Sequence, residues 1–239
     1  DDFPTDLSFH PSQNILAVST VMGDVMVYRY ANDENLLLHT HEIHRKGIRD
    51  IEFSSSGLDL FSCSRDKSIV CCDFETGKFK RFWDNAHTEP IYTISVVDEN
   101  LLASGDDEGT VRLWDLRVNT NEPVFSIKEV DDFISCITTN NQKKLLACTS
   151  GDGYLTTINI ASKKMYIQSE PYEEELSCAG IFRNESKLIV SSSKGNFYTF
   201  NWGEFGYHND AFSGPTTPIS FMLPITERIA ITAGEEGVI

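Results

Sequence analysis

A tight turn recurs at nearly constant intervals along this chain of 239 residues. The turn residues are Gly23, Lys67, Gly109, Gly153, Gly195 and Gly237, and the intervals between them are 44, 42, 44, 42 and 42 residues. Five residues after each of the first five turns stands a bulky or apolar residue, and a polar residue follows it. Such a period is typical of a chain that stacks one small structural unit many times.

Each repeat contains short runs with the alternating pattern of a half-buried β-strand, most clearly in residues 48–53. No segment of ten or more residues has helical periodicity, so we predict an all-β fold. Four strands in about 40–45 residues predict the blade of a β-propeller. We expect a single β-propeller domain over residues 1–239, with complete blades near 6–44, 45–87, 88–131, 132–173 and 174–216. The sixth blade, 217–239, is truncated, and we expect the parent protein to close with seven blades.

The charge balance of the chain restricts the classes of molecule that it can bind. The chain has 20 basic and 36 acidic residues, for a net charge of −16, which disfavours direct binding to a phosphate backbone. Acidic residues cluster in predicted turns, at 106–108, 131–132, 173–175 and 235–236. This acid either keeps a β-rich protein soluble or attracts a basic protein partner. No apolar run is long enough to span a membrane, and six cysteines without a C-x-x-C pair suggest buried thiols in a reducing compartment.

Residues 101–115 (LLASGDDEGTVRLWD), with Ala86-His87 upstream, resemble the consensus of the WD-repeat family. In that family a His, a Ser, a turn Asp and the Trp form a hydrogen-bonded relay within a blade. The resemblance places the relay at His87, Ser104, Glu108 and Trp114, with Asp107 as a substitute for Glu108. It therefore implies that His87 is structural rather than catalytic.

The second repeat keeps part of this pattern. His44, Ser62 and Asp66 match the relay, but Cys72 stands at the Trp place and cannot donate the last bond. Further stretches resemble a narrower group of WD-repeat proteins of ribosome biogenesis, namely residues 9–11, 97–107, 150–153, 169–171, 200–206 and 237–239. This resemblance implies a nuclear and nucleolar location, with the cytoplasm as an additional one, and a role in ribosomal RNA maturation. The implied function is a protein-interaction scaffold for assembly factors or basic ribosomal proteins.

Trp114-Asp115-Leu116-Arg117 carries the main alternative hypothesis. A W-D-x-R blade end resembles the box through which some WD-repeat proteins bind the adaptor of cullin-4 ubiquitin ligases. Trp114, Asp115 and Arg117 are then the docking residues, and the protein is a substrate receptor. The other interpretation is that Trp114-Asp115 belongs to the core and relay, while Arg117 is only solvated.

Other motifs predict no chemistry. His39, His41 and His44 lack the further ligand and spacing of a metal site, and Ser64–Lys67 has the S-x-x-K letters in a predicted turn instead of a helix. We therefore expect no enzyme activity, no metal and no cofactor. Four aromatic residues, Tyr172, Trp202, Phe205 and Tyr207, are either packed between blades or exposed to a partner.

Overall fold

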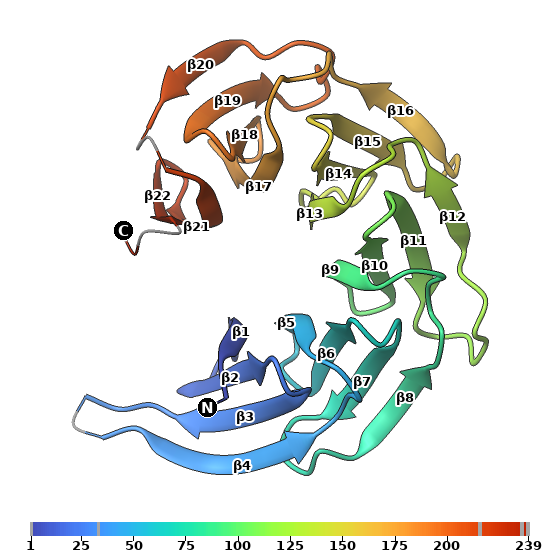
Figure 1. Cartoon of the computed structure of the whole chain (residues 1–239), viewed down its shortest axis with the longest axis vertical. Helices are drawn as coiled ribbons and strands as arrows, with labels where there is room; N and C mark the ends of the chain where they lie inside the picture. The colour runs from blue at the N-terminus through green and yellow to red at the C-terminus, as the bar shows by residue number, and fades with distance from the viewer. Residues whose placement is uncertain (1, 33, 215–216, 235–236, 238–239) are drawn as a thin grey trace. The chain divides into compact units, whose positions relative to one another are not determined.

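The computed structural model describes residues 2–32, 34–214, 217–234 and 237. This part of the chain folds into antiparallel β-sheets, as the repeat predicted (Figure 1). Among these residues there is no helix of the length and apolar character needed to cross a membrane. The described residues form five four-stranded sheets followed by one two-stranded sheet, as predicted for the blades of a β-propeller.

Strands that follow one another in the chain are neighbours in each sheet. The first three sheets consist of β1 (Pro4–Phe9), β2 (Ile15–Thr20), β3 (Asp24–Arg29) and β4 (Leu36–Glu42); β5 (Ile48–Phe53), β6 (Asp59–Ser64), β7 (Ile69–Asp73) and β8 (Phe79–Trp83); β9 (Ile91–Asp98), β10 (Leu101–Asp106), β11 (Thr110–Asp115) and β12 (Phe125–Lys128). The remaining three consist of β13 (Ile134–Thr138), β14 (Leu145–Ser150), β15 (Leu155–Asn159) and β16 (Lys164–Gln168); β17 (Leu176–Phe182), β18 (Lys187–Ser192), β19 (Asn196–Asn201) and β20 (Asp210–Ser213); β21 (Ile219–Thr226) and β22 (Ile229–Gly234).

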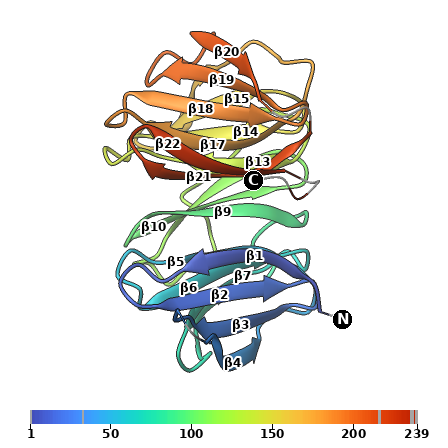
Figure 2. The ribbon, with the colours of Figure 1, turned by 90° about the vertical axis from the view of Figure 1, so that its left-hand side faces the viewer.

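The chain divides into two compact units. The first contains residues 1–107 and 112–124, and the second contains residues 108–111 and 125–239, so that the division falls within the third repeat. Within the first unit, β1 lies beside β5 and β5 beside β9 (Figure 2). Within the second unit, β13 lies beside β17 and β17 beside β21. The single domain over 1–239 stays a prediction.

The repeated turn has the same backbone conformation in successive sheets. Its φ is +100° at Gly23, +83° at Gly109 and +71° at Lys67. A side chain at Gly23 would also collide with the backbone carbonyl of His44. Glycine is therefore favoured at this turn, and Lys67 adopts a conformation that is uncommon for a residue with a Cβ atom.

Side chains of the first sheet bind the backbone of the second sheet. The Oδ2 atom of Asp6 on β1 accepts the N–H of Ile51 on β5 at 2.9 Å, and the Oγ atom of Ser8 accepts the N–H of Phe53 at 3.2 Å. Ile51 and Phe53 are two residues apart, so their N–H groups point to the same side of β5. These bonds join the innermost strands of two sheets that have no common backbone ladder.

The second sheet binds the third in the same way. The Oδ2 atom of Asp50 accepts the N–H of Ile94 and the hydroxyl of Thr93, both at 2.8 Å. The Oε2 atom of Glu52 accepts the N–H of Val96 at 2.7 Å. In these contacts and in those between the first two sheets, the donor lies 43 to 45 residues after the acceptor, which is about one repeat. The repeat therefore positions a side chain of one blade against the backbone of the next.

Candidate functional site

The third sheet contains a complete buried relay. The indole N–H of Trp114 donates to the hydroxyl of Ser104 at 2.8 Å, and that hydroxyl lies 2.6 Å from Nε2 of His87. Nδ1 of His87 lies 2.9 Å from a carboxylate oxygen of Asp106. Because a carboxylate only accepts, Nδ1 carries the proton and Nε2 accepts from Ser104. Burial lowers the pKa of His87, although the hydrogen bond to Asp106 opposes this, so the imidazole is neutral.

The relay carboxylate differs from the sequence prediction, which placed it at Glu108 or Asp107. Asp106 is the last residue of β10, and its side chain is fully buried. The turn residues that follow point elsewhere: Asp107 pairs with Arg49 of the second sheet, and Glu108 lies 3.7 Å from Nζ of Lys128. The prediction was wrong because the end of the strand, and not the turn, directs its side chain toward His87.

The second sheet has the predicted relay residues in contact. Nε2 of His44 lies 2.8 Å from the hydroxyl of Ser62, and Nδ1 lies 3.2 Å from Asp66 and 2.9 Å from Ser68. Burial raises the pKa of Asp66, but hydrogen bonds from His44 and Ser68 outweigh this and hold it well below its usual range. Cys72 is buried at the Trp place. Ser68 is a fourth member that the sequence prediction missed.

A third polar cluster, in the fifth sheet, was not predicted. Glu174 precedes β17 and accepts from the hydroxyls of Ser192 and Tyr198 and from the amide of Asn196. Burial raises the pKa of Glu174, and the three donors lower it by more, so the carboxyl is ionised. Asn196 follows its turn residue as Ser68 follows Lys67, and this equivalence was the sequence signal that could have predicted the cluster. The cluster was missed because the loop before β17 has Glu174 where the second repeat has His44.

Arg117 is exposed and held by its neighbour. Its side chain is 66% exposed, and its Nε and Nη2 atoms bind the two carboxylate oxygens of Asp115 at 2.9 and 2.7 Å. This contact lowers the pKa of Asp115 to about 2. Arg81 of β8 donates to the backbone carbonyls of Asp115 and Leu116, both at 3.3 Å, and so fixes the start of the loop. Trp114, which was also predicted as a docking residue, is buried and belongs to the core.

The three clustered histidines have separate environments. The rings of His39 and His41 stack at 5.6 Å on β4, and Nε2 of His41 lies 3.2 Å from the carbonyl of Phe74. His44 belongs to the relay. Among the described residues, no group of three His, Cys, Asp or Glu side chains has the geometry of a metal site.

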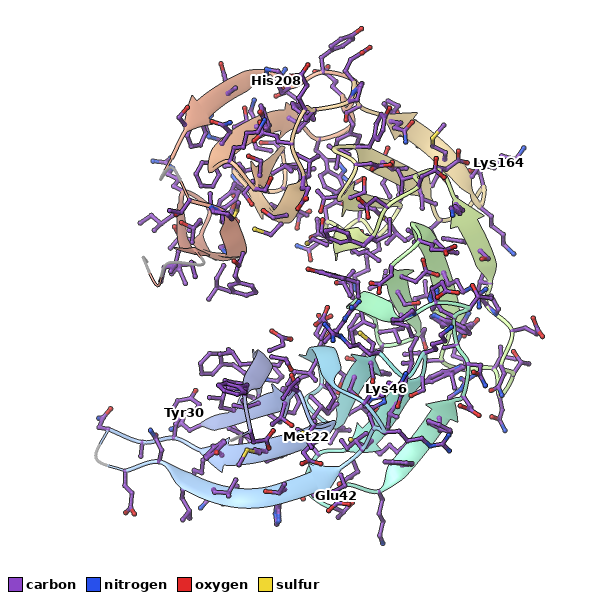
Figure 3. All side chains as sticks on the ribbon, in the orientation of Figure 1. Met22, Tyr30, Glu42, Lys46, Lys164 and His208 are labelled. Carbon is purple, nitrogen blue, oxygen red and sulfur yellow. The ribbon has the colours of Figure 1, made fainter. Side chains whose placement is uncertain are left out.

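The four aromatic residues divide between core and surface. Phe205 is fully buried, and Trp202 packs edge-on against it at 5.3 Å. The hydroxyl of Tyr172 lies 3.0 Å from Nδ1 of His208, which follows β19 (Figure 3). Tyr207 is 73% exposed. Packing between strands therefore accounts for Trp202 and Phe205, and Tyr207 is available to a partner.

Known proteins resemble this chain over its whole length. The family model described as WDR55 matches residues 1–239. The chain is 62% identical over 239 residues to the WD repeat-containing protein 55 homolog of Aedes aegypti. The aligned region covers 100% of this chain and 51% of that protein. It is 55% identical over 237 residues to the homolog of Drosophila erecta, and this aligned region covers 99% of this chain and 47% of that protein. The chain spans about half the length of the curated relatives it matches.

Proposed function

The chain belongs to the WDR55 family of WD-repeat proteins, and on this premise we propose that it is a non-enzymatic scaffold in ribosome biogenesis, located in the nucleus and nucleolus. WD-repeat proteins generally mediate protein interactions and are typically non-catalytic scaffolds. The relays support this proposal, because His87 and His44 are enclosed and bonded on both ring nitrogens. Their place in the blade core gives them a structural role.

The observation that carries the proposal is an acidic surface in the second unit. Asp131 and Asp132 lie in the loop between β12 and β13, and Glu173 and Glu175 lie in the loop between β16 and β17; all four residues are exposed. The Oδ2 atom of Asp152 accepts the N–H of Asp131 at 3.1 Å and keeps the first loop against the β14–β15 turn. Such a surface attracts basic proteins, and ribosomal proteins are basic.

Affinity purification of the full-length protein from nucleoli tests this function. We expect ribosome assembly factors and basic ribosomal proteins to copurify, and we expect depletion of the protein to delay pre-rRNA processing. Neutralising Asp131, Asp132, Glu173 and Glu175 to amides should reduce recovery of the basic proteins. Amides at the exposed Glu75 and Glu122, on other loops, serve as the control. Normal processing after depletion, with no ribosomal precursor recovered, would contradict the proposal.

The second candidate is a substrate receptor of a cullin-4 ubiquitin ligase, and the exposed, prealigned Arg117 guanidinium favours it. We expect Arg117→Ala to abolish binding to the ligase adaptor and to leave melting unchanged. Truncating a charged residue at an interface typically costs upwards of about 2 kcal/mol of binding free energy. Adaptor binding is measured by pull-down, with the exposed Arg29→Ala as the control variant. A folded Arg117→Ala protein that binds the adaptor normally would rule out this candidate.

A further inference from the structure

Three loops of the first unit pack together at one end of the first two sheets. They are the β2–β3 turn with Met22, the β4–β5 loop with Lys46, and the β6–β7 turn with Arg65; Met22 and Lys46 are labelled in Figure 3. The N–H of Arg65 donates to the carbonyl of Gly47 at 3.1 Å, and a side chain at Gly47 would touch the backbone of Val21. The three loops therefore form one continuous surface.

Three cations on this surface have no acidic partner. Arg45, Lys46 and Arg65 are all exposed, and none of them forms an ion pair within the described ranges. In a chain with a net charge of −16, an acidic neighbour would be the ordinary finding. Arg45 and Lys46 are adjacent in the β4–β5 loop, and the N–H of Arg65 in the β6–β7 turn donates to the carbonyl of Gly47, so the two loops present these three cations on one surface.

Three of the nearby acids are bound to other groups of the protein. Asp107 pairs with Arg49, and Glu89 lies 3.5 Å from Nζ of Lys67. Asp66 accepts from His44 in the relay and from the backbone N–H of Arg45 at 2.9 Å. Asp107 and Glu89 therefore face cations of their own, whereas Asp66 and Asp84 are the carboxylates beside the patch, and the three cations outnumber them.

Apolar groups lie beside the cations. Met22 is 65% exposed and Val21 is 42% exposed. On β8, the rings of Phe79 and Phe82 stack at 6.2 Å and are 51% and 39% exposed. Exposed large apolar side chains next to charge are typical of protein interaction surfaces.

A small hollow lies between the cationic and the apolar side chains of this surface. It has a volume of about 180 Å³, and Arg45, Ile43, Phe79 and Phe82 line it together with Asp66 and Asp84. A cavity of this size accommodates one large apolar side chain. The neighbouring Arg45 guanidinium would then meet a carboxylate on the same partner segment.

We propose that this surface, the cationic patch of Arg45, Lys46 and Arg65 with Met22 and Phe82, binds an acidic protein segment that carries large apolar side chains. The segment places an apolar side chain in the hollow beside Phe79 and Phe82, and its carboxylates against the three cations. The patch is opposite in charge to the acidic surface proposed above, so it binds a different partner.

A protein segment fits the patch better than RNA does. Binding of a nucleic acid relies on many phosphate contacts, and three cations on a chain of net charge −16 supply few of them. Met22 and Val21 favour apolar side chains instead.

Fluorescence anisotropy with a short labelled peptide of alternating glutamate and leucine tests the proposal on the full chain. We expect this peptide to bind, and we expect Arg45→Glu/Lys46→Glu to weaken binding at least about tenfold, because two attractive contacts become repulsive. Phe82→Ala should also weaken binding, because it opens the hollow. The matched control is Lys163→Glu/Lys164→Glu, which makes the same charge change at the β15–β16 hairpin of the other unit (Figure 3).

Two further probes distinguish the classes of partner. A peptide of alternating lysine and leucine should not bind, and single-stranded oligouridine should bind no more tightly to the unaltered protein than to Arg45→Glu/Lys46→Glu. Failure of the glutamate–leucine peptide to bind would overturn the proposal. So would equal loss in the Lys163→Glu/Lys164→Glu control, or patch-dependent binding of oligouridine in place of the peptide. None of these outcomes depends on ribosome biogenesis.

Discussion

Replacing Asp106 by alanine should lower the free energy of unfolding by about 1–3 kcal/mol, because it leaves the buried Nδ1–H group of His87 without an acceptor. Both side chains are fully buried and lie 2.9 Å apart. The turn carboxylates Asp107 and Glu108 are partly exposed, and alanine at either should cost no more than about 1 kcal/mol. Urea denaturation of the three variants measures the difference.

Two other variants report on the same relay. Trp114→Phe removes the donor to Ser104 and should cost about 1–3 kcal/mol, and His87→Ala should destabilise the third sheet by a comparable or larger amount. Asp106→Asn keeps an oxygen that accepts from His87, so it should be milder than Asp106→Ala. If Asp107→Ala or Glu108→Ala were as damaging as Asp106→Ala, the carboxylate assigned to the relay would be wrong.

Stability should fall as the pH rises from about 5 to about 8, through the titration of Glu52. Burial is the main cause that raises the pKa of Glu52 to about 7; repulsion by Asp6 adds to it, and the hydrogen bond from Val96 opposes it. In the unfolded chain the same carboxyl has a pKa near 4.5. The folded state therefore binds more protons between these values, and stability is lost as the pH rises through this window. We expect a loss on the order of 1–3 kcal/mol.

Glu52→Gln isolates this effect. The glutamine oxygen still accepts the N–H of Val96 but cannot ionise, so the variant should be more stable than the unaltered protein at pH 8 and should depend less on pH. Burial also raises the pKa of Asp50, and repulsion by Asp6 adds to this, so part of the slope should persist. Glu75→Gln, on an exposed turn, is the control. Identical pH profiles for Glu52→Gln and the unaltered protein would contradict the assignment.

Local patterns predicted the strands well. The strand that alternation predicted at residues 48–53 is β5 (Ile48–Phe53). Alternation of apolar residues and turn glycines are properties of neighbouring residues, so one sequence carries them. The closure of the parent protein with seven blades stays a prediction.

Side-chain partners were harder to predict. The spacing of residues predicted the relay of the second sheet. For the third sheet it predicted a carboxylate in the turn, whereas the structure has Asp106 at the end of β10. Glu174 replaced a histidine altogether and was missed. The contacts of Asp50 and Glu52 depend on how closely adjacent sheets approach, which is a long-range property that the spacing of residues within one repeat does not encode.

The contacts between sheets have a consequence for aggregation. β5 and β9 are edge strands of their sheets, and the outward N–H groups of an edge strand can template pairing with another polypeptide. The N–H groups of Ile51 and Phe53 on β5, and of Ile94 and Val96 on β9, are already occupied by side chains of the preceding sheet. A nascent chain that has formed its first two blades therefore leaves fewer free donors on β5 for a foreign strand to capture while the later blades are still being synthesised.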